Sequence, residues 1–129
     1  MLNQKSKDLF VATYDSMLER TAENGYAKTS ITGAYPGMFG RDSSIQIMSH
    51  IAVGDYDYAL KLLSFIVEYH KKHDANYVLH IMYNDDFNAE LTPPDDTLQP
   101  DATFFFLHAW YLYATQAPES EIKTVFLES

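Results

Sequence analysis

The side chains best suited to chemistry lie in the segment GAYPGMFGRDSSIQ, residues 33–46, where Arg41 and Asp42 stand next to each other. An arginine presents a planar fork of hydrogen-bond donors, and an aspartate accepts through two oxygens. Because every sugar hydroxyl both donates and accepts, this pair suits neighbouring hydroxyls on a sugar. Tyr35 and Phe39 can supply a flat apolar wall for the ring. Asp42 also fits as an ordinary helix N-cap, so the residues by themselves leave both interpretations open.

A further carboxylate in a comparable place is Asp101, in the segment QPDAT. Acids are common in the first turn of a helix without any further role. Asp101 is a candidate for binding and for catalysis, and the sequence identifies no other catalytic group. Inverting hydrolysis of a glycoside needs two carboxyl groups about 6.5 to 9.5 Å apart with a water between them. Asp85, Asp86, Glu90 and Asp101 are available for such a pair, and no spacing selects two of them.

Metal and cofactor chemistry have little support in this sequence. The chain has no cysteine, so thiolate metal sites and disulfides are excluded. His70 and His73 share a predicted helix face without an evident third ligand, and the HExxH, glycine-rich phosphate-loop and GxSxG motifs are missing. The acids of residues 74–99 do not follow the calcium-loop pattern. We therefore expect no metal and no cofactor.

The charge balance restricts the partners. The formal net charge is −9, from 18 acidic and 9 basic residues, and residues 74–122 contain nine acids but no lysine or arginine. Nucleic acids and anionic membranes bind basic patches, so neither is expected as a partner. The longest apolar-rich run, residues 104–114, has 11 residues and is too short to cross a bilayer. Since the N-terminus carries no apolar leader, the expected location is the cytoplasm.

The elements that must position these side chains are predicted to be helices. Apolar residues recur at helical spacing, which indicates helices over residues 8–23, 43–53, 55–72, 100–115 and from 118 onward. Ser6 or Asp8 is the expected cap of the first. His108, inside the aromatic fourth segment, is expected in the core. Residues 77–83 have the composition of a short strand. The predicted fold is all-α, one domain spanning residues 1–129.

The lengths of the connections predict which residues meet. Two connections are long, residues 24–41 and 74–99, and they alternate with very short ones. In a series of antiparallel helices, every second connection lies at the same end. Both long connections therefore lie at one end, together with Arg41, Asp42 and Asp101. Long loops in compact domains are commonly functional.

Two stretches resemble a known family. YPGMFGRDSSIQIMSHIAVGDYDYALKLLSFIVEYH, residues 35–70, is similar to the arginine-aspartate hairpin of the six-hairpin (α/α)6 glycosidases, which include glucoamylases, glycogen-debranching amyloglucosidases and trehalases. QPDATFFFLHAWYLYAT, residues 99–115, resembles a second hallmark, a carboxylate that heads the inner helix of the next hairpin. The likeness covers residues 30–115, and the motifs lie 60 residues apart, as in debranching-type members.

The resemblance implies about a third of an (α/α)6 toroid and a segment of an exo-acting glycoside hydrolase that recognises a terminal sugar. The residues matching Arg41 and Asp42 bind hydroxyls of that sugar in the −1 subsite, and the residue matching Asp101 lies at the pocket end. Phe39-Gly40 stands where many members have tryptophan and a polar residue, so the sugar is not specified.

The family's general acid and base usually come from later hairpins. This chain is therefore expected to bind an oligosaccharide or glycoside and to be inactive by itself. The alternatives are a non-catalytic helical interaction module and a carbohydrate-binding subunit. Because a toroid cut into hairpins has bare apolar flanks, we also expect a homo-oligomer, or the remainder of the barrel, to cover them.

Overall fold

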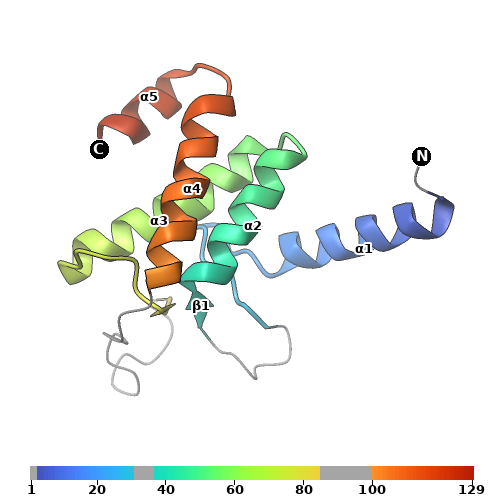
Figure 1. The fold of residues 1–129 in the computed structure, drawn as a ribbon, viewed down its shortest axis with the longest axis horizontal. Helices are drawn as coiled ribbons and strands as arrows, with labels where there is room; N and C mark the ends of the chain where they lie inside the picture. Colours follow the sequence, from blue (N-terminus) through green and yellow to red (C-terminus); the bar gives the residue numbers. More distant parts are fainter. Residues whose placement is uncertain (1–2, 31–36, 85–99) are drawn as a thin grey trace.

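The computed structural model describes residues 3–30, 37–84 and 100–129. Within these ranges the chain forms five helices and one two-stranded ribbon, which confirms the predicted all-α character (Figure 1). The helices are α1 (Gln4–Glu19), α2 (Gly40–Ala52), α3 (Tyr56–His73), α4 (Pro100–Gln116) and α5 (Glu121–Glu128), and the strands are β1 (Met38–Phe39) and β2 (Ile81–Met82).

Side-chain caps explain where three of the helices begin. Asn3 Oδ1 accepts a hydrogen bond from the N–H of Ser6 at 2.9 Å, so α1 starts earlier than predicted and neither Ser6 nor Asp8 is its cap. Asp55 accepts a backbone N–H from the first turn of α3, and Ser120 does the same for α5. Because each cap satisfies a backbone N–H that has no partner inside its helix, these starts are set by local chemistry.

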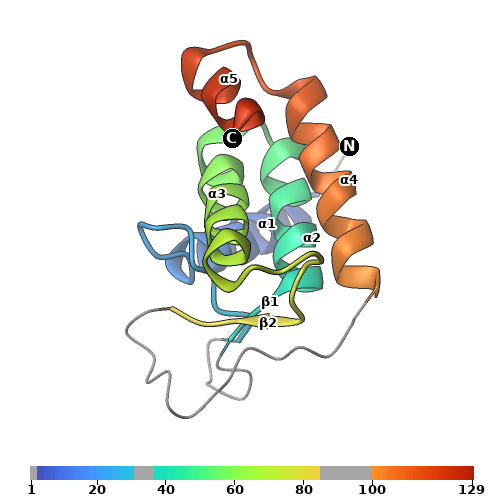
Figure 2. The same ribbon diagram turned by 90° about the vertical axis from the view of Figure 1, so that its left-hand side faces the viewer.

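The body of the molecule is a stack in which α2 lies between α3 and α4 (Figures 1 and 2). The helix α3 runs antiparallel to the other two, so α2 and α4 run in the same direction, side by side (Figure 2). The facing sides bury an apolar core, to which each of the three helices contributes: Ile47, Ile51, Ala59, Leu62, Leu63, Ile66, Ala102, Ala109 and Tyr113. This packing places the N-termini of α2 and α4 at the same end.

The two long connections meet at that end in an antiparallel ribbon. Strand β1 pairs with β2, with Met38 opposite Met82. The backbone N–H of Gly40, the first residue of α2, donates to the carbonyl of His80 at 2.9 Å. The strand tendency of residues 77–83 is confirmed at β2, whereas nothing in the sequence predicted its partner β1. The ribbon joins both long connections, as their alternation with short turns predicts.

Helix α1 does not join the antiparallel series, because it leaves the body and runs crosswise to it (Figure 1). None of its residues is buried. Its C-terminal part lies against α2, where Tyr14, Met17 and Leu18 are half-buried, while residues 7–13 are all exposed. The regular series of helices therefore begins with α2.

Helix α4 is apolar around most of its circumference, yet only one side is packed against the body. Ala102, Ala109 and Tyr113 are buried, whereas His108 is exposed, so its predicted place in the core is wrong. The exposed side carries Phe104 as well. In the described residues, no helix has both the length and the apolar content that crossing a bilayer requires.

Candidate functional site

Three charged side chains meet where α2 and α4 begin. Arg41 Nη1 lies 3.2 Å from Asp101 Oδ2, and Arg41 Nη2 lies 3.7 Å from Asp42 Oδ2. The side chains of Arg41, Asp42 and Asp101 are 50, 42 and 40 % exposed. The structure thus brings together the Arg-Asp pair and the carboxylate that lies 60 positions further along the chain. One guanidinium bridges two carboxylates from neighbouring helices, and all three groups remain open to solvent.

A close approach of the backbones holds this arrangement in place. A Cβ added at Gly40 would lie 2.6 Å from the carbonyl oxygen of Leu79, 2.8 Å from Cγ1 of Val78 and 3.3 Å from Cβ of Ala102. Real Cβ atoms do not approach a carbonyl oxygen that closely, so a side chain at this position would push the start of α2 away from Val78 and Leu79 and from α4. The glycine before Arg41 therefore permits the close approach of α2 to α4 at the site.

The interpretation of Asp42 as a helix N-cap is wrong. The N-cap of α2 is Phe39, which makes no side-chain capping bond. Asp42 lies in the first turn, where the helix dipole favours an acid. Asp101 is also in a first turn, and its Oδ1 accepts the backbone N–H of Ala102 at 2.8 Å while Oδ2 faces Arg41. Both carboxylates thus lie at helix N-termini, where backbone N–H groups add hydrogen-bond donors to the site.

The remaining predicted site residues are placed only in part. Phe39 is half-buried, and its ring packs edge-on against His80 with 5.0 Å between the ring centres. Tyr35 lies outside the described residues, as do Asp85, Asp86 and Glu90. The site that can be described therefore consists of Arg41, Asp42 and Asp101 with Phe39 next to them in the chain.

The geometry of this site favours binding over acid catalysis. Both carboxyl oxygens of Asp101 act as hydrogen-bond acceptors, Oδ2 from Arg41 and Oδ1 from the backbone N–H of Ala102, and this arrangement suits binding better than proton donation to a leaving group. The guanidinium has donors directed at Asp42 and Asp101, and the exposed carboxylate oxygens accept further hydrogen bonds. An array of fixed donors and acceptors at two helix N-termini can bind a ligand that has several neighbouring hydroxyls.

The histidines that share a face of α3 are His70 and His73, and His70 makes contacts through both ring nitrogens. His70 Nε2 accepts the backbone N–H of Leu79 at 3.0 Å, and His70 Nδ1 faces the carbonyl of Ile66. His70 Nε2 therefore holds the segment after α3 against the helix, while Nδ1 faces a carbonyl of α3 itself. Among residues 3–30, 37–84 and 100–129, no three histidine or acidic side chains converge as a metal ion would require.

A buried polar network that the sequence analysis missed joins α1 to the body. Tyr14 Oη donates to Asp55 Oδ2 at 2.6 Å and lies 3.0 Å from His50 Nδ1. Gln46 Nε2 lies 3.3 Å from His50 Nε2 and donates to Thr21 Oγ1 at 3.1 Å. His50 is completely buried. Helix α2 has Gln46 and His50 four residues apart, and that spacing is the only sequence signal for the network.

One assignment of hydrogen-bond donors and acceptors fits all the contacts of this network. Since the single hydroxyl proton of Tyr14 goes to Asp55, His50 Nδ1 must donate to Tyr14 Oη, which leaves His50 Nε2 as the acceptor for Gln46. His50 is therefore neutral. Burial lowers its pKa below the ordinary 6.5, and the charge of Asp55 opposes this only in part. Burial and the bond to Asp55 raise the pKa of Tyr14, which keeps its hydroxyl protonated.

The protein is expected to lose stability as the pH falls from 7 to 5. In the unfolded chain His50 takes up a proton near its ordinary pKa, whereas in the folded protein its lowered pKa delays protonation. The unfolded state then binds more protons, so the free energy of unfolding decreases with decreasing pH in this window. Urea unfolding of the wild type and of His50→Gln at several pH values measures the effect.

The His50→Gln variant separates this effect from that of the other histidines and the carboxylates. Its pH dependence between 7 and 5 should be clearly shallower than that of the wild type, although its stability at pH 7 is lower. Parallel curves for the two proteins would contradict the assignment of a neutral, buried His50.

Comparisons with known proteins do not identify a family. No protein-family model, no curated protein and no solved structure matches this chain. The resemblance to the six-hairpin glycosidases therefore stays a prediction that rests on two sequence motifs. What the structure shows is that Arg41, Asp42 and Asp101 meet at one end of the helical stack.

Proposed function

We propose that the chain forms part of the sugar-binding wall of an exo-acting glycoside hydrolase of the six-hairpin type. The observation that carries the proposal is the position of the Arg41 guanidinium, between Asp42 of its own helix and Asp101 of the neighbouring helix. Such a site presents donors and acceptors in a fixed array, and vicinal hydroxyls of a terminal sugar need both.

The arrangement of helices supports the same proposal. Helices α2 and α4 run in the same direction side by side (Figure 2). Helix α3, which comes between them in the sequence, runs antiparallel to both. In an (α/α)6 toroid the inner helices are parallel to one another, so their N-termini share one rim, and the outer helices return antiparallel. In this assignment α2 and α4 are inner helices and α3 is an outer helix.

The proposed contribution of the chain is binding without turnover. Catalysis requires groups that stabilise the transition state more than the ground state, and an acid and a base must be placed on the two sides of the scissile bond. The described site offers two carboxylates, but both are engaged with Arg41. The acid and base would come from other hairpins of a complete barrel.

We expect the purified chain to bind a pyranose sugar weakly and to hydrolyse none. Amide NMR spectra recorded with a panel of mono- and disaccharides should show shifts concentrated at residues 39–42 and 101–102. Asp42→Asn should weaken binding by about 10- to 100-fold, since a hydrogen bond to a charged group contributes about 1.5–3 kcal/mol and about 1.4 kcal/mol corresponds to a factor of ten. p-Nitrophenyl glycosides should stay intact.

Glu68→Gln is the matched control, because it makes the same carboxylate-to-amide change at another exposed ion pair, with Lys71 on α3. It should leave sugar binding unchanged. If no sugar in the panel shifts these amides, the proposal fails. If the chain hydrolyses a glycoside and Asp101→Asn abolishes the activity, Asp101 is a general acid and the chain is catalytic by itself.

A non-catalytic helical interaction module is the second candidate. It is favoured by one observation, the amount of apolar surface that remains exposed on α1 and α4, including Leu9, Phe104 and Leu107. A module of this kind would use those surfaces and would not need the Arg41 site. The sugar panel separates the two candidates, since an interaction module gives no shifts around Arg41.

A further inference from the structure

The N-terminal half of α1 is an apolar surface without a partner among the described residues. Leu9, Phe10 and Val11 are 69, 52 and 54 % exposed, and Ala12, the next residue, is exposed as well. Runs of three or four consecutive exposed apolar residues are unfavourable in a soluble protein unless they serve a function. An isolated helix of this length is also only marginally stable in water. This half of α1 therefore has the properties of a segment that another surface covers.

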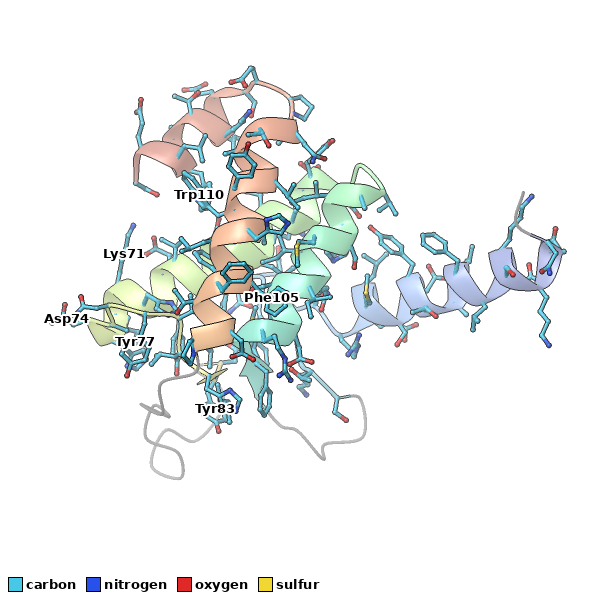
Figure 3. The ribbon with its side chains drawn as sticks, in the orientation of Figure 1. Lys71, Asp74, Tyr77, Tyr83, Phe105 and Trp110 are labelled. Carbon is cyan, nitrogen blue, oxygen red and sulfur yellow. The ribbon has the colours of Figure 1, made fainter. Side chains whose placement is uncertain are left out.

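The outer face of α4 is a second apolar surface of the same kind. Phe104, Leu107 and Tyr111 are 70, 58 and 59 % exposed and follow one another at helical spacing. Next to Leu107, between α3 and α4, lies a hollow of about 360 Å³ whose lining includes Val67 and Phe106. Tyr77 and Lys71 also line it, on the side of the molecule away from α1 (Figure 3). This face thus has both apolar area and a recess beside it.

The two surfaces cannot cover each other within one chain, because α1 runs away from the helical stack (Figure 1). The network around His50 fixes this course, since Tyr14 in α1 is held at once by His50 in α2 and by Asp55 at the start of α3. The exposed half of α1 therefore projects beyond the point where Tyr14 attaches the helix to the body.

We propose that the protein forms a two-fold dimer in which the exposed half of α1 of each copy packs on the outer face of α4 of the other. This pairing covers both apolar surfaces at once, whereas a contact of α4 with α4 would leave Leu9, Phe10 and Val11 in water. Successive residues lie about 100° apart around a helix, so the contact is centred on Phe10 and covers Leu9 and Val11 in part. With roughly 100 Å² for each fully covered side chain, two copies bury on the order of 1,000 Å², the least expected of a specific interface.

Charge on the two surfaces does not oppose this pairing. The exposed half of α1 carries Lys5 and Lys7 beside Asp8, and α4 carries one acid, Asp101, and no lysine or arginine. The net charge of −9 repels a second copy as a whole, so the apolar contact has to outweigh this repulsion. The proposal does not depend on the sugar site.

Sedimentation equilibrium tests the dimer directly. The wild-type protein should be dimeric at micromolar concentration, and added salt should not dissociate it, since the contact is apolar and screening weakens the repulsion between two acidic chains. Phe10→Glu and Leu107→Glu should each raise the dissociation constant by at least 100-fold. Val125→Glu is the matched control, because Val125 on α5 is also 62 % exposed but lies outside the proposed contact. Circular dichroism checks that each variant is folded.

Disulfide trapping identifies the two surfaces in contact. Because the chain has no cysteine, Phe10→Cys and Leu107→Cys can be prepared as separate proteins, mixed and oxidised. The mixture should give a cross-linked dimer of one variant with the other, in clear excess over what either variant forms alone. A monomeric wild type overturns the proposal. So does a dimer that Leu107→Glu dissociates and Phe10→Glu does not, because α4 would then pack on α4.

Discussion

Replacing Gly25 with alanine is expected to reduce the free energy of unfolding by about 3 kcal/mol or more. Gly25 has φ of +90°, a region that costs an L-residue about 1–2 kcal/mol. A Cβ at this position would lie 2.0 Å from the backbone carbonyl oxygen of Lys61 in α3. Since a helix backbone cannot move aside as a flexible side chain can, overpacking adds about 1–3 kcal/mol.

The expected loss is large because Gly25 forms the turn that attaches residues 20–30 to α3. The Gly25 N–H donates to the carbonyl of Ala22 at 2.9 Å, and the next residue, Tyr26, is buried with its ring 5.6 Å from that of Phe65. Displacing the turn would withdraw this tyrosine from the core. Denaturant unfolding and the melting temperature report the change.

Gly54→Ala is the matched control for Gly25→Ala. Gly54 has φ of +81°, but a Cβ built there meets nothing within 4 Å. The same chemical change then carries the conformational cost alone, about 1–2 kcal/mol. If the two variants lose equal stability, the close contact between Gly25 and Lys61 does not exist in solution, and the prediction is wrong.

Replacing Gly40 with alanine is expected to destabilise the protein by about 2–3 kcal/mol and to abolish sugar binding. Helix propensity alone predicts the opposite sign, because alanine in a helix is about 1 kcal/mol more favourable than glycine. The close contacts of a Cβ with Leu79 and Val78 oppose this gain, and relieving them requires α2 to shift. The sign of the measured change therefore decides which effect is larger.

The sugar affinity of the site should fall together with the free energy of unfolding, because Gly40 directly precedes Arg41. A shift of the α2 N-terminus moves the guanidinium away from Asp101 and breaks the array that the two helix ends form. Asp101→Asn is the comparison variant. It removes the charge of an exposed ion pair, which is worth about 0–1 kcal/mol, so it should reduce sugar affinity while the stability stays nearly unchanged. A stable Gly40→Ala that binds sugar normally would refute the proposed role of this close contact.

The sequence by itself determined the helices of the body and the end at which the charged residues gather. The periodicity of residues 43–53 and 55–72, the Asp55 cap and the Gly54 turn are local signals, and α2 and α3 follow them closely. The alternation of long and short connections correctly predicted that the start of α2 and the start of α4 lie together. Such signals can be recognised in the sequence because capping and amphipathic spacing depend on residues within a few positions of one another.

Only the tertiary structure decided how α1 is placed and which polar groups become partners. The Tyr14 bond to Asp55 spans 41 positions and the Arg41 pair with Asp101 spans 60. No local pattern encodes such partners, because they depend on how whole helices pack. For the same reason the sequence could not tell that Gly40 lies where Val78, Leu79 and Ala102 leave no room for a Cβ. Interactions between residues close in the sequence determine where the helices of this protein form. Packing between distant segments determines which helices become neighbours.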